Sequence, residues 1–149
     1  MNVKDLKKDI PFKWRVQSVN KNGASCVAYI DARDVQDLLD EVCGQNSWQV
    51  KYSEHKGNLF CAIGIDNGSE YIWKEDCGTE SNVEKEKGEA SDAFKRAAVM
   101  WGVGRFLYSK PIIKLDVIEK NSKFFPSFNG KQLYGDKITD ACNYKLKNK

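Results

Sequence analysis

The sequence predicts an α+β fold, in which an antiparallel β-meander and a β-hairpin pack against a long helix and a shorter helix. Three observations support this fold class. A hairpin signal lies near the N-terminus, three strand-like runs are joined by short turns, and two segments carry apolar residues at helical spacing. Turns this short join antiparallel strands, and the order of the elements indicates a sheet with helices on one side.

The N-terminal elements are a short helix and the hairpin. Residues 4–9 are expected to form the helix, which ends before Pro11 because proline disrupts a helix interior. The hairpin strands are expected over residues 14–19 and 24–30. Asn22-Gly23 lies between them, and this dipeptide is typical of tight hairpin turns.

The shorter helix is expected to begin after Asp31, which is a good N-cap residue, and to end at Gly44. Its first turns are rich in acidic residues, which the helix dipole favours. One face of this helix is apolar and includes Val35, Leu38, Leu39 and Val42.

The meander is expected to consist of residues 48–53, 58–65 and 69–75. The linkers between these three runs are short and rich in turn-forming residues. The middle run is the most apolar of the three, which is typical of a central strand.

The longest helix is expected over residues 82–101, with Gly102 at its C-terminal cap. Its buried stripe is predicted to contain Ala90, Phe94, Ala97, Ala98 and Trp101, widened by Ala93 and Met100. So many alanines allow another backbone to approach the helix closely.

The C-terminal part is expected to hold one strand over residues 112–118. An irregular apolar arm is expected over residues 124–128 and at Leu133-Tyr134, followed by a lysine-rich tail that frays from Ala141 onward. Since no domain linker or internal repeat is visible, residues 1–149 are expected to form a single domain.

Composition and charge indicate a globular chain with an anionic partner. Hydrophobic residues make up 41% of the chain, no apolar run reaches the length of a membrane span, and the N-terminus does not resemble a secretory signal. The net charge is only +3, but residues 1–30 and 110–149 are basic whereas residues 31–80 are acidic. Such asymmetry favours contact with an anion on one face.

The five cysteines are odd in number and include no CxxC pair. We therefore interpret them as small core residues. The alternative, a zinc site, would have to combine scattered cysteines with His55, the only histidine.

The long helix also carries a cationic face. Lys87, Ser91 and Lys95 are spaced four apart, and Arg96 lies beside them. A paired ammonium and guanidinium can bind successive phosphates. The alternative interpretation is a solvated charged face with local pairs, such as Glu84 with Lys87.

Arg15 adds a cation to the hairpin, although a lone strand arginine is usually a surface residue. The tryptophans at positions 14, 48, 73 and 101 could stack on bases, but each lies where its element needs a large apolar group, so core packing is favoured. No phosphate loop or activated nucleophile is present.

An acidic group suggests one possible function, that of a metal-dependent nuclease. The group contains Asp66, Glu70, Glu75, Asp76 and Glu80, with Lys74 nearby. The spacing of these carboxylates matches no nuclease motif.

Several of these segments resemble the Rad52-type family of single-strand annealing proteins. The similar segments, which occur in the family's order, are residues 29–35, 41–44 with Trp48, Lys87, residues 91–97 and Gly102. The resemblance covers about residues 12–115, and the short form of the chain is similar to the phage and prophage branch.

The resemblance implies a ring or helical filament of subunits that holds single-stranded DNA in a basic groove and anneals complementary strands without ATP. The family's DNA contacts carry over to Lys95 and Arg96, to Lys87, and to Arg15. The expected protein is a phage-type recombinase with no enzymatic activity and no cofactor or metal. It would act in the cytoplasm of a bacterial host, where a phage or host single-strand binding protein is a possible partner. The alternatives are a general single-strand binder that does not anneal and the metal-dependent nuclease.

Overall fold

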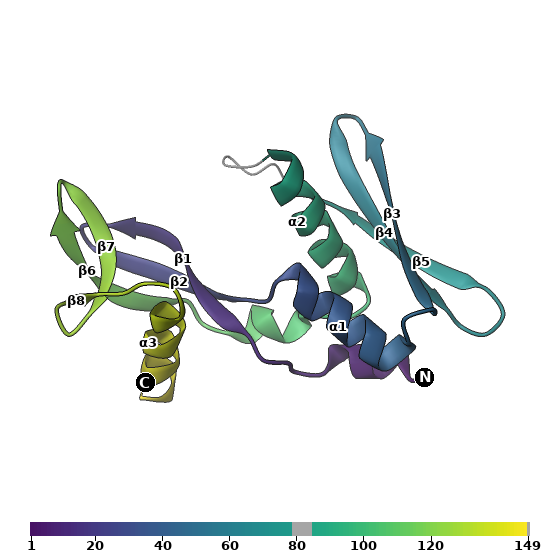
Figure 1. The fold of residues 1–149 in the computed structure, drawn as a ribbon, viewed down its shortest axis with the longest axis horizontal. Helices are drawn as coiled ribbons and strands as arrows, with labels where there is room; N and C mark the ends of the chain where they lie inside the picture. The colour runs from purple at the N-terminus through teal and green to yellow at the C-terminus, as the bar shows by residue number, and fades with distance from the viewer. Residues whose placement is uncertain (79–84, 149) are drawn as a thin grey trace. The chain divides into compact units, whose positions relative to one another are not determined.

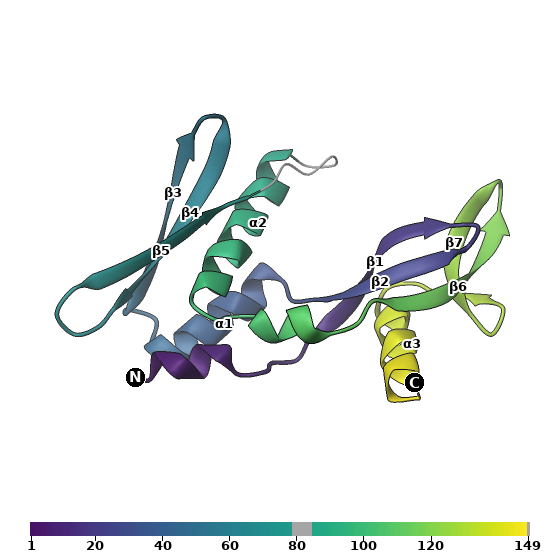
Figure 2. The same cartoon turned by 180° about the vertical axis from the view of Figure 1, so that it is seen from behind.

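The computed structural model describes residues 1–78 and 85–148 (Figures 1 and 2). The chain divides into two compact units. The first contains Met1–Ile10 and Asp31–Phe106, and the second contains Pro11–Ile30 and Leu107–Lys149. Each unit is therefore assembled from two separate segments, which explains why no linker is visible in the sequence. That the chain forms a single DNA-annealing domain stays a prediction.

The first unit contains the predicted meander. Its strands are β3 (Trp48–His55), β4 (Asn58–Asp66) and β5 (Tyr71–Cys77), which pair antiparallel in that order. The central strand β4 has three fully buried side chains, from Cys61, Ile63 and Ile65. The prediction that the middle run is the central strand is confirmed.

Helix α2 (Lys85–Met100) packs against β4 and β5, as both views show (Figures 1 and 2). Its buried face contains Ala93, Phe94, Ala97 and Ala98, as predicted. Ala90 and Trp101 are half-buried, and the prediction for Met100 is wrong because its side chain is 44% exposed. Trp101 takes the sheet-facing position at this end, where its indole N–H donates to the carbonyl oxygen of Ile63 (2.9 Å).

Helix α1 (Ala32–Cys43) begins at Asp31, as predicted. Asp31 and Asp34 form a reciprocal capping box, in which each side chain accepts from the other's backbone N–H. The N-terminal segment forms a 3₁₀ helix, η1 (Val3–Lys7), where a short helix over residues 4–9 was expected. Its only buried side chain is Leu6, so a single turn is enough to bury its apolar surface.

The second unit contains a five-stranded antiparallel sheet of order β1-β2-β6-β7-β8. Its strands are β1 (Lys13–Asn20), β2 (Gly23–Tyr29), β6 (Ile113–Lys120), β7 (Lys123–Phe128) and β8 (Lys131–Gln132). The predicted hairpin is β1 and β2, and the predicted strand after Pro111 is β6, which pairs with β2. The α+β fold class is confirmed.

The prediction of an irregular arm is wrong, because residues 123–128 form β7. Asn121 and Ser122 both have positive φ angles, of 52° and 65°, and so make the two-residue turn that pairs β7 with β6. Asn-Ser is a weaker turn signal than Asn-Gly. Leu133 is also ordered, since its N–H donates to the carbonyl oxygen of Pro126 (2.9 Å).

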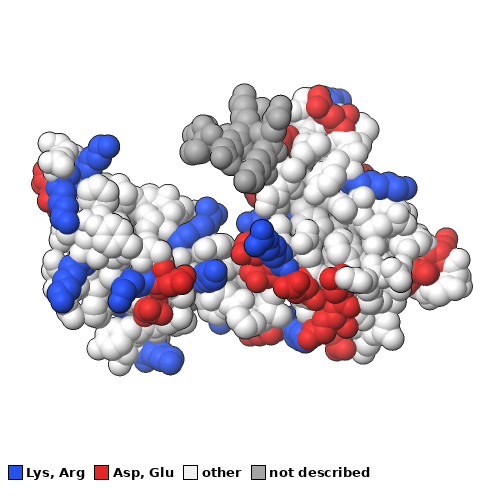
Figure 3. All heavy atoms as spheres, viewed as in Figure 1, with Lys and Arg blue, Asp and Glu red and all other residues white. Residues whose placement is uncertain are grey.

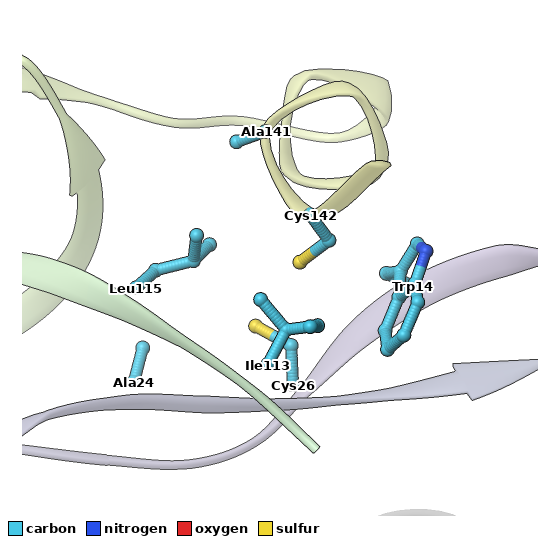
Figure 4. Close-up of a cluster of buried hydrophobic side chains, with 7 residues drawn as sticks. All are labelled: Trp14, Ala24, Cys26, Ile113, Leu115, Ala141 and Cys142. Carbon is cyan, nitrogen blue, oxygen red and sulfur yellow. The ribbon is translucent and has the colours of Figure 1, made fainter. Parts of the chain in front are cut away.

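The prediction of a fraying tail is also wrong, because Asp136–Lys147 forms helix α3. Ala141 and Cys142 are buried against the sheet, in the cluster drawn in Figure 4. The apolar residues Ile138, Ala141, Cys142 and Leu146 recur at helical spacing. The many lysines of this segment masked this short stripe in the sequence.

All five cysteines are free thiols, and Cys26, Cys43, Cys61 and Cys142 are buried. Their interpretation as core residues is confirmed for these four. The hydrogen bond between the Cys26 and Cys142 side chains lowers the pKa of Cys26 and, together with burial, raises the pKa of Cys142.

None of the helices in residues 1–78 and 85–148 has the length and the apolar composition that a membrane-spanning helix requires.

Candidate nucleic-acid interface

Helix α2 holds Lys95 and Arg96 between buried residues of its own sequence. Phe94 precedes the pair and Ala97 follows it, and both pack beneath the helix. Lys95 is half-buried and Arg96 is exposed. The side chains of Lys95 and Arg96 therefore extend from the margin of the buried face of α2. Packing on the sheet holds the helix backbone in place there.

Arg96 forms an ion pair with Asp92, one helical turn earlier. The Nε of Arg96 lies 2.9 Å from the carboxylate of Asp92. A pair this exposed contributes little to stability, about 0.3–0.5 kcal/mol. Its larger effect is local, because it orients the guanidinium and places one negative charge beside it.

The C-terminus of α2 is held by a Schellman motif and by the guanidinium of Arg105. Gly102 has a φ of 105°, and Val103 N–H donates to the carbonyl of Ala98 (3.0 Å). The guanidinium of Arg105 donates to the carbonyls of Val99 (2.8 Å) and Met100 (2.9 Å). Positive charge here also complements the helix dipole.

The N-terminal half of α2 is fixed to the sheet by a very close approach. A Cβ at Gly78, just after β5, would lie 2.4 Å from the carbonyl oxygen of Glu89. The Glu89 carboxylate accepts a hydrogen bond from the N–H of Leu59 on β4 (2.9 Å). These contacts and the C-terminal motif restrain the helix on both sides of the Lys95-Arg96 pair.

Arg15 lies on β1 in the second unit and is exposed. It stands opposite Val27 of β2, and its guanidinium carbon lies 5.8 Å from the ring centroid of Tyr29. Lys87 belongs to α2, but its side chain lies outside the described residues. Lys95 and Arg96 thus lie together on α2 in the first unit, whereas Arg15 belongs to the second unit.

The tryptophans are engaged within their own units. Trp14 is buried, and Trp48, Trp73 and Trp101 are half-buried. The indole N–H groups donate from Trp14 to Asn143, from Trp48 to Asp40 and from Trp101 to Ile63. The predicted core packing is confirmed for Trp14, and Trp48 and Trp101 pack at the margins of the core. Trp73 stands opposite Gly64, on the face of the meander that points away from the buried side chains of Ile63 and Ile65, so the core-packing prediction is wrong for Trp73.

The ring of Trp73 contacts two neighbouring strands. One face lies on Gly64, where a Cβ would be 2.8 Å from the ring atoms, and the ammonium of Lys51 lies 4.3 Å from the ring centroid.

The carboxylates considered for a nuclease lie on and around β5. In residues 1–78 and 85–148, no three His, Cys, Asp or Glu side chains gather as a potential metal site. Glu80, one member of that predicted set, lies outside the described residues.

Charge is divided unequally between the two units. The second unit has twelve Lys and Arg residues against four Asp and Glu residues, a net charge of +8, and the first has twelve against seventeen, a net charge of −5. Figure 3 shows carboxylates gathered over α1 in the first unit. The modest net charge of the whole chain thus conceals a strongly basic unit.

Two contributors to the α2 site were missed in the sequence. The spacing of Asp92 and Arg96 is the ordinary i,i+4 signal of a helix ion pair. Arg105 gave no such signal, since its contacts form only because Gly102 turns the chain back over the helix end.

Replacing Arg105 by alanine should lower the free energy of unfolding by roughly 1–2 kcal/mol, because two carbonyls lose a charged donor. Arg105→Lys should cost less, since the charge remains at the helix end. Urea denaturation measures both effects. The exposed control Arg33→Ala should change stability little, and an equal loss in Arg33→Ala and Arg105→Ala would contradict the capping role.

Residues 4–124 match the model of the Rad52/22 family of double-strand break repair proteins. The single-stranded DNA-binding protein DdrA of Deinococcus deserti is 35% identical over 104 residues, covering 68% of this chain and 51% of the relative. Its counterpart in Deinococcus radiodurans is 33% identical over 122 residues, covering 74% and 58%. The chain spans about half the length of these curated relatives, and it belongs to the Rad52/22 family.

Proposed function

We propose that the chain binds single-stranded DNA and anneals complementary strands in recombination and repair, without catalytic chemistry of its own. The observation that carries this proposal is the Lys95-Arg96 pair on the anchored helix α2. Membership of a double-strand break repair family supports it, as does similarity to two proteins named for single-stranded DNA binding.

The proposed mode of binding uses the phosphates and leaves the bases free. Annealing requires base edges that can pair with a second strand, so a protein that promotes it should bind the backbone. Ammonium and guanidinium groups suit this task because they neutralise phosphates and release counterions. Arg15 on β1 and Lys87 on α2 are proposed as further contacts with the same strand.

The double variant Lys95→Ala, Arg96→Ala should bind single-stranded DNA more weakly and with a flatter salt dependence. Loss of two phosphate contacts should reduce the log–log slope by about 1.4, at roughly 0.7 per contact. Fluorescence anisotropy across a salt series measures this slope. The control Lys4→Ala, Arg33→Ala removes the same charge from exposed positions of the same unit. Equal slopes for the two double variants would remove Lys95 and Arg96 from the site.

Annealing should proceed without nucleotide or divalent metal. Complementary oligonucleotides carrying a fluorophore and a quencher should pair faster with the protein than without it, in the presence of chelator and the absence of ATP. Binding without acceleration would favour the general single-strand binder, and DNA cutting that depends on magnesium would favour the nuclease.

We also propose that the chain works as a ring or helical filament. The outer edges of β3 and β5 have no partner strand among the described residues. Val50, Tyr52 and Ile72 lie on these edge strands with exposed fractions of 37%, 47% and 38%. A repeated head-to-tail contact there would bury apolar surface and align the cations of many subunits. A phage or host single-strand binding protein in the bacterial cytoplasm is a candidate partner of such an assembly.

Light scattering at micromolar concentration should give a mass several times the 17.0 kDa of one chain. Tyr52→Lys should reduce that mass, because it places a charge on the exposed apolar strip, and Glu54→Lys on the same strand is the matched control. A monomer that persists after addition of single-stranded DNA would exclude the oligomer.

A further inference from the structure

The five-stranded sheet of the second unit has two different faces. One face packs on α3 through Trp14, Ala24, Cys26, Ile113 and Leu115, whose side chains form the cluster in Figure 4. Because side chains alternate along a strand, the residues between these point to the opposite face. None of the described helices of this unit packs there.

This opposite face, here called the open face, carries cations on both sides of β2. Lys13 and Arg15 extend from β1, and Lys114 extends from β6, directly opposite Ser25 of β2. All three cations are exposed. The carbons of the Lys114 side chain lie near Gly23, at 3.9 and 4.0 Å from where its Cβ would be, which confirms the side on which Lys114 lies.

On the open face, Arg15 and Lys114 lie on opposite sides of β2, and their side chains extend toward its opposite ends, Arg15 toward Tyr29 and Lys114 toward Gly23. Arg15 and Lys114 are separated by β2, at about 12 Å between Cα atoms from standard strand spacing and rise. Between them lie Val27 and Ser25, which are half-buried and present no acidic group. Asp116, two residues beyond Lys114 on β6, is the first carboxylate along that strand on this face.

We propose that Lys114 binds a phosphate of the single-stranded DNA, and that the DNA crosses the open face from Arg15 over β2 to Lys114. This inference rests on the proposed function and adds a residue to its binding path. The basic character of the unit, +8 by sequence, favours an anionic ligand. A surface that grips phosphates through long side chains needs no deep pocket.

The test compares Lys114→Ala with Lys137→Ala in the full chain. Lys137 is an equally charged, exposed residue in the first turn of α3, the helix on the other face of the sheet. Lys114→Ala should flatten the salt slope of single-stranded DNA binding by about 0.7, and weaken binding to a similar extent for oligonucleotides of different sequence. Lys114→Arg should retain the wild-type slope, and Lys137→Ala should change it far less.

The experiment distinguishes failure of the Lys114 inference from failure of the proposed function. Circular dichroism first establishes that each variant is folded, and Lys114→Gln replaces Lys114→Ala if the alanine variant is not. If the Lys95, Arg96 double variant loses slope while Lys114→Ala behaves as Lys137→Ala does, the path over β2 is excluded and the proposed function stands. If the wild-type chain does not bind single-stranded DNA, both proposals are overturned.

Discussion

The packing of α2 on the meander is the constraint on which the candidate site depends. Four buried side chains, three of them alanines, bring the helix backbone close to β4 and β5. Gly78 allows the closest approach, because any side chain there would collide with the backbone of the helix. A helix held this firmly can keep Lys95 and Arg96 in position when they repel one another. Rigidity of the backbone therefore takes the place of a binding pocket.

The division of charge gives the two units different electrostatic properties. A basic unit attracts an anionic polymer, whereas an acidic unit repels it except where cations gather locally. In the first unit, Arg96 lies beside Asp92, so its attraction for a phosphate is moderated by a neighbouring carboxylate. A single chain with a net charge of +3 would hold DNA weakly, and the proposed assembly would strengthen binding through repetition of the same cations.

The fold could be predicted where a local signal and the tertiary structure agreed. Asn22-Gly23 fixed the hairpin, Asp31 fixed the start of α1, and the alanine-rich stripe fixed the buried face of α2. The prediction failed where the signal was weak or obscured. Asn121-Ser122 adopts the conformation of an Asn-Gly turn without its usual sequence, and the lysines of α3 concealed an apolar stripe.

The candidate site could be predicted in part for the same reason. Lys95 and Arg96 are neighbours in sequence, so their proximity required no knowledge of the fold. Lys114 is brought to the face of Arg15 only by the pairing of β6 with β2, between segments that lie far apart in the sequence. No local pattern contains that pairing. Contacts made across a sheet are therefore the part of this site that only the structure supplies.

The contacts of the tryptophan side chains help to distinguish two candidate functions, annealing of DNA strands and simple coating of single-stranded DNA. A protein that stacks bases on exposed rings holds those bases away from a second strand. Here three indole N–H groups donate inside the fold, and the ring of Trp73 lies against Gly64 with the Lys51 ammonium 4.3 Å from its centroid. Lys74 likewise lies 4.6 Å from the ring centroid of Trp101. Because these rings are already in contact with the protein, they favour the proposed mode of binding, in which the phosphates are held and the bases remain able to pair.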